Sequence, residues 1–129
     1  MKKQIAGMPI LRIVPGSESL ILDSDPRIIV SVYVVVIEAE PLAIFSSFGR
    51  PLEKTCLPKE RQEEFFEKHR LHLHPRGWAN LFLFEENNKL FITIAYNTSP
   101  RLITRKVVPI TWSHRIDRKS AVRVIVPKQ

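Results

Sequence analysis

The residues nearest to a catalytic pattern are His72 and His74, with His69 shortly before them. Two imidazoles at positions i and i+2 of a β-strand share one face and can bind one metal ion, as in cupin-like barrels. Such a site needs a third ligand and usually a fourth. The only other histidine is His114, and no Asp or Glu follows His74 at a spacing typical of a further metal ligand. Surface or interface histidines, including an interface sensitive to protonation, are therefore favoured over a small metal-dependent β-barrel enzyme.

Motifs of other enzyme classes are absent from the sequence. It contains no Gly-rich phosphate loop, Cys-x-x-Cys pair, Gly-x-Ser-x-Gly elbow or His-Glu-x-x-His helix. The single cysteine, Cys56, excludes an internal disulfide and fits a reducing compartment, and we expect an inert, buried or half-buried thiol. We therefore predict a protein that is not an enzyme and that needs no cofactor.

The strongest chemical signal is the positive charge of residues 101–129. This segment holds eight Lys or Arg residues and one acid, Asp117, so its balance equals the formal net charge of +7 of the whole chain. Such a field attracts nucleic acid, an anionic membrane surface or an acidic protein, and the alternative is that the charge serves solubility alone. The candidate membrane- or RNA-binding residues are Arg101, Arg105, Lys106, Arg115, Arg118, Lys119 and Arg123.

Two tryptophans stand beside basic residues. Trp78 follows Arg76 and Gly77, and Trp112 precedes His114 and Arg115. This combination can bind single-stranded nucleic acid through phosphate contacts and base stacking. The alternative places both tryptophans in the core or at an oligomer interface. We favour that alternative for Trp78 and leave both open for Trp112.

The basic segment is expected to be folded, because β-branched and aromatic residues lie between its charges. In residues 121–126, three alternate valines share one face of a strand, and Arg123 points away from it. A turn is expected around residues 115–120. The basic groups should therefore be displayed on strands and on a turn of a rigid surface.

Strand patterns dominate the rest of the chain. Residues 28–37 form an apolar run of ten, far short of the roughly 20 that a membrane-spanning helix needs. Their β-branched side chains predict a strand that is covered on both faces. Residues 78–84 and 89–96 flank the polar residues 85–88 and predict a buried hairpin. Shorter strands are expected at residues 10–14, 20–22, 42–45 and 70–74, the last with Leu71 and Leu73 on one face and His72 and His74 on the other.

Residues 58–69 are the one good helix candidate. Pro58 suits the first turn, and acidic residues precede basic ones in the order that the helix dipole favours. Phe65 and Phe66, with Leu57, are the expected apolar anchors. The acidic face is either a partner surface or, as we favour, simply solvated.

The length and the lack of repeats predict one domain over residues 1–129, with its basic C-terminal third at residues 101–129. Its expected fold is mainly β, in the α+β class. The arrangement that satisfies the pattern is a two-layer antiparallel β-sandwich-like domain with one or two short helices.

Several segments, taken in order over residues 10–106, resemble one protein family. They are Ile13 to Gly16 with Leu20, Leu22 and Asp23; Glu40 to Leu42; Leu57 to Glu60 with Phe65 and Phe66; Leu73 to Pro75 continuing to Asn80 and Phe84; and Leu90 to Asn97 with Thr93. Their collinear order resembles the matrix proteins of bornaviruses and nyamiviruses, which are enveloped negative-strand RNA viruses.

This resemblance implies a non-enzymatic structural protein with a β-sandwich-like fold. It implies a homo-oligomer, often a tetramer, that contacts the inner leaflet of an anionic membrane and binds single-stranded RNA or nucleoprotein, with no small-molecule substrate. The implied location is the virion beneath the envelope, the host cytoplasm and the inner face of host membranes. No Pro-Pro-x-Tyr or Pro-Thr-Ala-Pro budding motif is present. The alternative function is a stand-alone RNA-binding module, such as a viral silencing suppressor.

Overall fold

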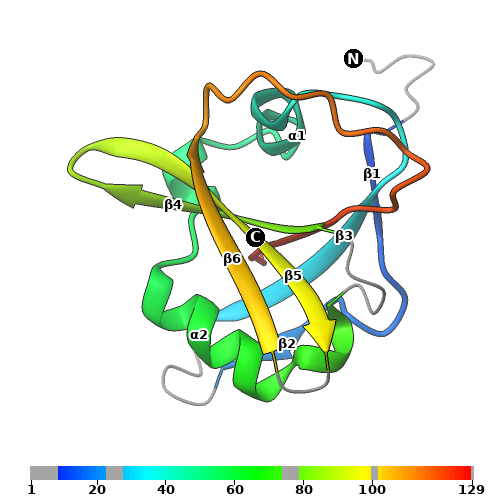
Figure 1. Cartoon of the computed structure of the whole chain (residues 1–129), viewed down its shortest axis with the longest axis vertical. Coiled ribbons are helices and arrows are strands. Elements are labelled where there is room, and N and C mark those ends of the chain that lie inside the picture. The colour runs from blue at the N-terminus through cyan, green and yellow to red at the C-terminus, as the bar shows by residue number, and fades with distance from the viewer. Residues whose placement is uncertain (1–8, 23–27, 74–78, 100–101, 129) are drawn as a thin grey trace.

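The computed structural model describes residues 9–22, 28–73, 79–99 and 102–128, and these form a β-rich α+β domain. The expected fold class is confirmed. The elements in chain order are β1 (Leu11–Ile13), β2 (Leu20–Ile21), β3 (Ile29–Val35), α1 (Pro41–Ser46), η1 (Leu52–Thr55), α2 (Lys59–Lys68), η2 (Arg70–His72), β4 (Ala79–Glu86), β5 (Lys89–Ser99), β6 (Leu102–Pro109) and β7 (Arg123–Pro127), with η marking short 3₁₀ helices (Figure 1).

The described strands form one open sheet in the order β1-β3-β7-β4-β5-β6, and β2 also pairs with β3. Every pairing is antiparallel except that of β4 with β7. The last strand in the sequence is therefore a central strand of the sheet. It joins β3 to the β4–β5–β6 meander and brings the last part of the basic segment into the middle of the sheet.

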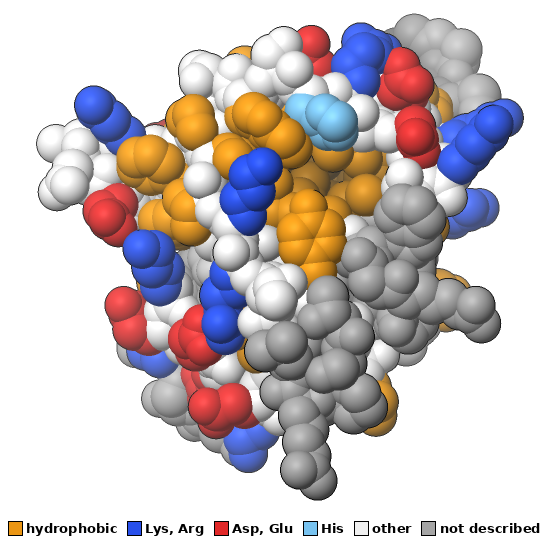
Figure 2. All heavy atoms as spheres, viewed as in Figure 1, with side chains coloured by type: hydrophobic (Ala, Val, Ile, Leu, Met, Phe, Trp, Pro, Cys, Tyr) orange, Lys and Arg blue, Asp and Glu red, His pale blue; other side chains and the backbone are white. Residues whose placement is uncertain are grey.

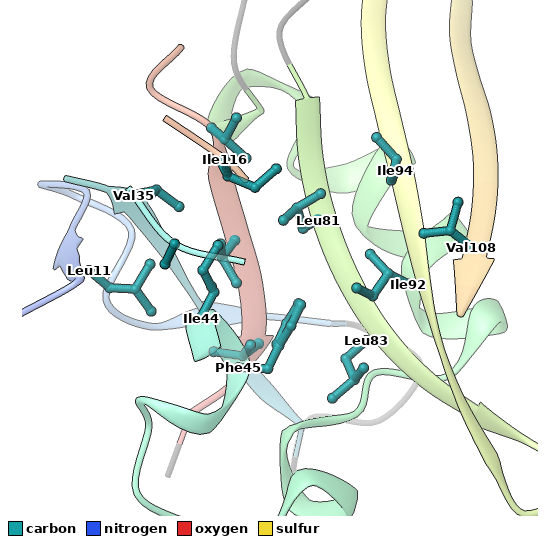
Figure 3. Close-up of a cluster of buried hydrophobic side chains, with 14 residues drawn as sticks. Leu11, Val35, Ile44, Phe45, Leu81, Leu83, Ile92, Ile94, Val108 and Ile116 are labelled. Carbon is teal, nitrogen blue, oxygen red and sulfur yellow. The ribbon is translucent and has the colours of Figure 1, made fainter. Parts of the chain in front are cut away.

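Each face of the sheet is covered by one helix (Figure 1). On the first, which we call the α1 face, Ile44 and Phe45 of α1 pack with Leu81, Ile94 and other buried aliphatic residues (Figure 3). On the opposite side, the α2 face, Phe65 and Phe66 pack on Phe82 and on aliphatic residues of β2, β3 and β7. A fully buried side chain of this size contributes about 1.5–3 kcal/mol to stability. The sheet is thus buried on both sides, as expected for residues 28–37.

The β4–β5 hairpin is confirmed, with longer strands than expected. Glu86 pairs with Lys89, so only Asn87 and Asn88 form the turn. Both have positive φ, 53° and 64°, which is the backbone of a type I′ turn. Asparagine tolerates this left-handed conformation better than most residues, and this makes the tight turn compatible with the sequence.

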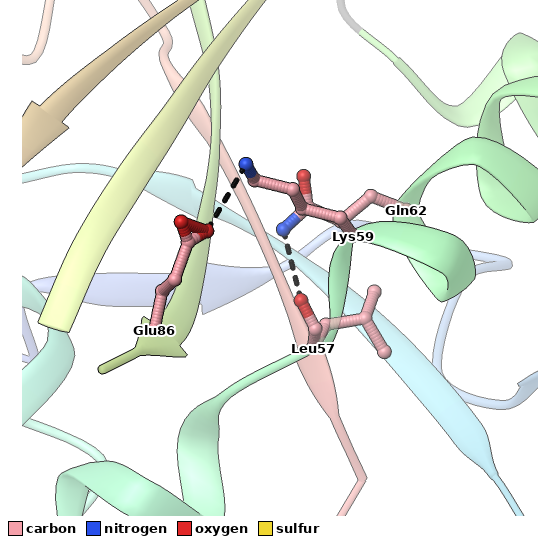
Figure 4. A network of polar contacts seen from close by, with 4 residues as sticks. All are labelled: Leu57, Lys59, Gln62 and Glu86. Carbon is pink, nitrogen blue, oxygen red and sulfur yellow. Dashed lines mark hydrogen bonds and ion pairs between the residues drawn. The ribbon is translucent and has the colours of Figure 1, made fainter. Parts of the chain in front are cut away.

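Helix α2 is confirmed with the expected anchors. Phe65, Phe66 and Leu57 are buried, and Gln62 is buried with them. The Gln62 amide donates to the Leu57 carbonyl oxygen at 2.8 Å, and Lys59 pairs with Glu86 at 3.3 Å (Figure 4). These contacts attach the start of α2 to the preceding loop and to the end of β4.

Two expected strands are wrong. Residues 42–45 belong to helix α1, which begins at Pro41, a residue suited to the first helical position. Residues 70–72 form the 3₁₀ helix η2, so the predicted alternation fails: Leu71 is 96% exposed while Leu73 is 1% exposed. Three or four alternating residues are too few to distinguish a strand from a turn that follows a helix. His74 and Trp78 lie outside the described residues.

Candidate anion-binding surface

Residues 110–122, which we call the cap segment, connect β6 to β7 and cross the α1 face beside α1 (Figure 1). An isolated antiparallel bridge between Ile116 and Ala39 fixes the middle of the cap segment. At its end, the Val35 N–H donates to the Val122 carbonyl oxygen at 2.9 Å. Ile116 and Val122 are buried in the α1-face core. The cap segment therefore has a fixed path even though it contains no strand or helix.

A tight turn within the cap segment presents two cations. Asp117 Oδ1 accepts hydrogen bonds from the Ser120 N–H at 2.8 Å and from the Ser120 hydroxyl at 3.1 Å. These bonds stabilise the carboxylate and lower the pKa of Asp117. Ala121 closes the turn with φ of 48°. Arg118 and Lys119 lie exposed between these residues, in the turn expected from the sequence.

Arg115 precedes this turn, whereas Lys106 of β6 lies against Trp112, and the two cations have different electrostatic settings. Arg115 Nε donates to Glu38 Oε2 at 2.6 Å, and this contact raises the pKa of the guanidinium. The carboxylate therefore offsets much of the charge of Arg115. The Lys106 ammonium lies 5.6 Å from the centroid of the Trp112 ring, within the range of a cation–π contact.

Arg105 and Arg123 lie on the α2 face. Successive residues of a strand point to opposite faces, so Arg105 and Lys106 lie on opposite sides of the sheet. Arg105 Nη2 lies 2.7 Å from Glu63 Oε1, and its guanidinium lies 4.8 Å from the centroid of the Phe66 ring. Arg123 is half-buried, and its Nη1 donates to the His72 carbonyl oxygen at 2.6 Å. Burial lowers the pKa of Arg123. Val122, Val124 and Val126 share the α1 face and Arg123 lies on the other, so the predicted alternation is confirmed.

The seven candidate cations therefore do not form a single patch. The structure places Lys106, Arg115, Arg118 and Lys119 on or beside the cap segment. Arg105 and Arg123 are engaged with side chains or backbone of the other face. Arg101 lies outside the described residues.

A pocket that the sequence did not reveal opens beside these cations. Its volume is about 220 Å³, and it is lined by Leu81 and Ile94 of the hairpin and by Trp112, Asp117 and Ser120 of the cap segment. The His114 ring stacks on Trp112 with 4.8 Å between ring centroids and 15° between planes. Figure 2 shows hydrophobic side chains gathered around a hollow on this face, with a histidine at its edge. The sequence drew attention to Trp112, His114 and Arg115 among the lining residues, but not to the floor, which comes from strands far away in the chain.

The histidines do not assemble a metal centre among the described residues, which contain no group of three or more His, Cys, Asp or Glu able to hold a metal ion. The His69 and His72 rings lie 5.9 Å apart, and His69 Nε2 is 2.8 Å from the Ile21 carbonyl oxygen. Burial, then the neighbouring His69 and Arg123, lowers the pKa of His72.

Cys56 is half-buried, as expected, and its Sγ lies 3.5 Å from the Leu52 carbonyl oxygen. Burial, with smaller effects of Glu85 and Glu53, raises the pKa of Cys56 to about 11. A thiol with this pKa is almost entirely protonated near neutral pH and is a poor nucleophile. This favours a structural role for the side chain.

Comparison of the chain with protein-family models, curated proteins and solved structures gives no match. Within the described residues, no helix has both the length and the apolar character to cross a membrane.

Proposed function

We propose that this chain is a non-enzymatic viral matrix protein that self-assembles beneath the envelope and binds an anionic membrane, with single-stranded RNA or nucleoprotein as its second ligand. The observation that carries the proposal is the display of Lys106, Arg118 and Lys119 around the cap segment, on a backbone fixed by the Ile116–Ala39 bridge. The collinear resemblance to matrix proteins adds the viral setting.

The size of the patch explains why self-assembly belongs to the proposal. Each Lys or Arg near an anionic surface contributes about 1 kcal/mol of attraction. Three exposed cations therefore give about 3 kcal/mol for one protomer, which is weak binding. Arg115 adds less because Glu38 offsets its charge. An oligomer presents several copies of the patch at once, and such multivalency converts weak contacts into stable attachment.

A stand-alone RNA-binding module is the second candidate, and the stacked Trp112–His114 pair favours it. His114 is exposed and offers an aromatic surface next to cations, a combination that binds single strands. This candidate predicts tight RNA binding without affinity for vesicles.

The test is co-sedimentation of the purified chain with anionic and with neutral vesicles, combined with light scattering of the chain alone. We expect a discrete oligomer that sediments only with anionic vesicles, and less binding as salt increases. The variant R118E/K119E should lose most of this binding. K54E/K89E makes the same charge change at exposed positions outside the cap segment and outside the proposed cation set, and it should bind much more tightly than R118E/K119E. A monomer indifferent to both vesicle types would contradict the proposal.

A further inference from the structure

The pocket under the cap segment has an apolar floor with room for one large side chain. Leu81, Ile94 and Val122 belong to the buried core, and Tyr96 and Trp112 are half-buried beside them. A cavity of about 150 Å³ holds a benzene ring, so the 220 Å³ of this pocket accommodates an aromatic or branched aliphatic side chain. Transfer of such a side chain from water onto an apolar surface is favourable.

The rim of the same pocket is cationic. Lys106 lies over the Trp112 ring at one wall, and Arg115, paired with Glu38, lines the pocket. Arg118 and Lys119 line the adjoining pocket, which shares Asp117 with this one. The one acidic group in the lining, Asp117, uses Oδ1 to accept two hydrogen bonds from Ser120. Its negative charge is outnumbered by the exposed cations Lys106, Arg118 and Lys119 nearby. Electrostatic complementarity therefore favours a ligand with negative charges on either side of an apolar group.

The chemistry of the floor distinguishes among anionic ligands. A nucleobase carries hydrogen-bonding groups around its edge, and those that reach the floor would face the apolar side chains of Leu81, Ile94 and Val122. One side of Trp112 is also covered by His114. An acidic peptide avoids both conflicts, because an aliphatic or aromatic side chain has an apolar edge and its acidic neighbours remain at the rim.

We propose that the pocket binds a bulky apolar side chain of an acidic peptide segment in a partner protein. The apolar side chain occupies the floor between Trp112 and Val122, and the flanking carboxylates pair with Lys106, Arg118 and Lys119. This inference goes beyond membrane attachment. It shares the cations with that proposal but adds an apolar floor that membrane attachment does not use, so the two can be tested separately.

The test uses the full chain with labelled methyl groups and three synthetic pentapeptides, followed by NMR. The first peptide has a central tryptophan between two acidic residues on each side. We expect it to shift the methyl signals of Leu81, Ile94 and Val122 in a saturable way. The second replaces the tryptophan by alanine and the third replaces the acids by lysines. Each should bind at least tenfold more weakly. Equal binding of the alanine peptide would overturn the proposal.

Two matched substitutions locate the site. Ala79 lines the pocket, so the larger side chain of A79L fills it and should weaken binding of the tryptophan peptide at least tenfold. Ala43 is exposed on α1 and outside this pocket, so A43L should leave binding unchanged. If A79L lacks the dispersed spectrum of a folded chain, K106E with K54E as its control replaces this pair. Unchanged peptide binding by the folded pocket variant would overturn the proposal.

Two further outcomes separate this proposal from the other ligands. A single-stranded oligonucleotide that shifts the floor methyl signals, with no effect of the peptide, would identify a base-binding pocket and contradict us. Folded A79L should still sediment with anionic vesicles, because it keeps all cations. Loss of vesicle binding by wild type with intact peptide binding would therefore refute the membrane function alone.

Discussion

The Arg123 side chain in β7 donates from Nη1 to the carbonyl oxygen of His72, 2.6 Å away, and so ties the central strand to the turn that follows α2. The sequence suggested Arg123 as a contact for an anionic surface. Its half-buried position on the α2 face instead gives it a contact inside the molecule.

We predict that R123M lowers the free energy of unfolding by about 1.5–3 kcal/mol, the usual contribution of a hydrogen bond to a charged group. The His72 carbonyl oxygen would lose its charged donor, while the aliphatic part of the side chain would be kept. Urea unfolding measures the effect. R12M, at an exposed position of β1, should change stability by less than about 0.5 kcal/mol. Equal effects of the two variants would contradict the assignment.

We predict that F65A destabilises the chain by about 3–5 kcal/mol, because it leaves a cavity on the α2 face. Phe65 is fully buried and lies edge-to-face against Phe82, with 5.8 Å between ring centroids. Thermal or urea unfolding tests this value. E67A on the exposed side of the same helix is the control and should be nearly neutral. A small effect of F65A would mean that α2 does not pack on the sheet.

We predict that N88G raises stability by a few tenths of a kcal/mol to about 1 kcal/mol, and that N88V lowers it by about 1–2 kcal/mol. Asn88 has φ of 64°, where glycine is unstrained and a β-branched residue is strongly disfavoured. Unfolding experiments on the two variants give opposite signs if the type I′ turn is present. The same sign for both would indicate another turn.

We predict that stability decreases when the pH falls below about 6.5. The pKa of His72 is lowered in the folded chain, so below its unfolded value of 6.5 the unfolded chain binds more protons and gains relative stability. Urea unfolding across pH 7.5 to 5 measures this slope, and NMR titration gives the pKa of the ring directly. H72Q should reduce the slope. H114Q makes the same substitution on the α1 face and serves as the control. An unchanged slope in H72Q would contradict the prediction.

Much of the fold was predictable because it depends on local patterns. The β-branched run in β3, the polar gap between β4 and β5, and Phe65 with Phe66 in α2 each specify one element. In β7 the alternation even gave the correct face for Arg123. These patterns are long or chemically distinctive, and tertiary contacts support them.

The errors arose where a short segment depends on its neighbours. Residues 42–45 became helix α1 because Pro41 starts a helix and Ile44 and Phe45 then reach the core. The pocket could not be predicted, since Leu81, Ile94 and Trp112 come together only through the pairing of β4 with β5 and the path of the cap segment. For the cations, the positive charge was evident from the sequence, but the partners Glu38 and Glu63 were not.

The insertion of β7 between β3 and β4 has a consequence for synthesis of the chain. Until residues 123–127 leave the ribosome, β3 and β4 each present an unpaired edge, and the two halves of the sheet have no strand between them. A nascent chain can form the β4–β5–β6 meander early, from neighbouring segments, and β3 can pair with β1 and β2. The other edge of β3 must wait for β7, about 90 residues further along the chain. Exposed strand edges favour aggregation. The order of translation therefore makes the basic C-terminal region the last piece needed to close the sheet.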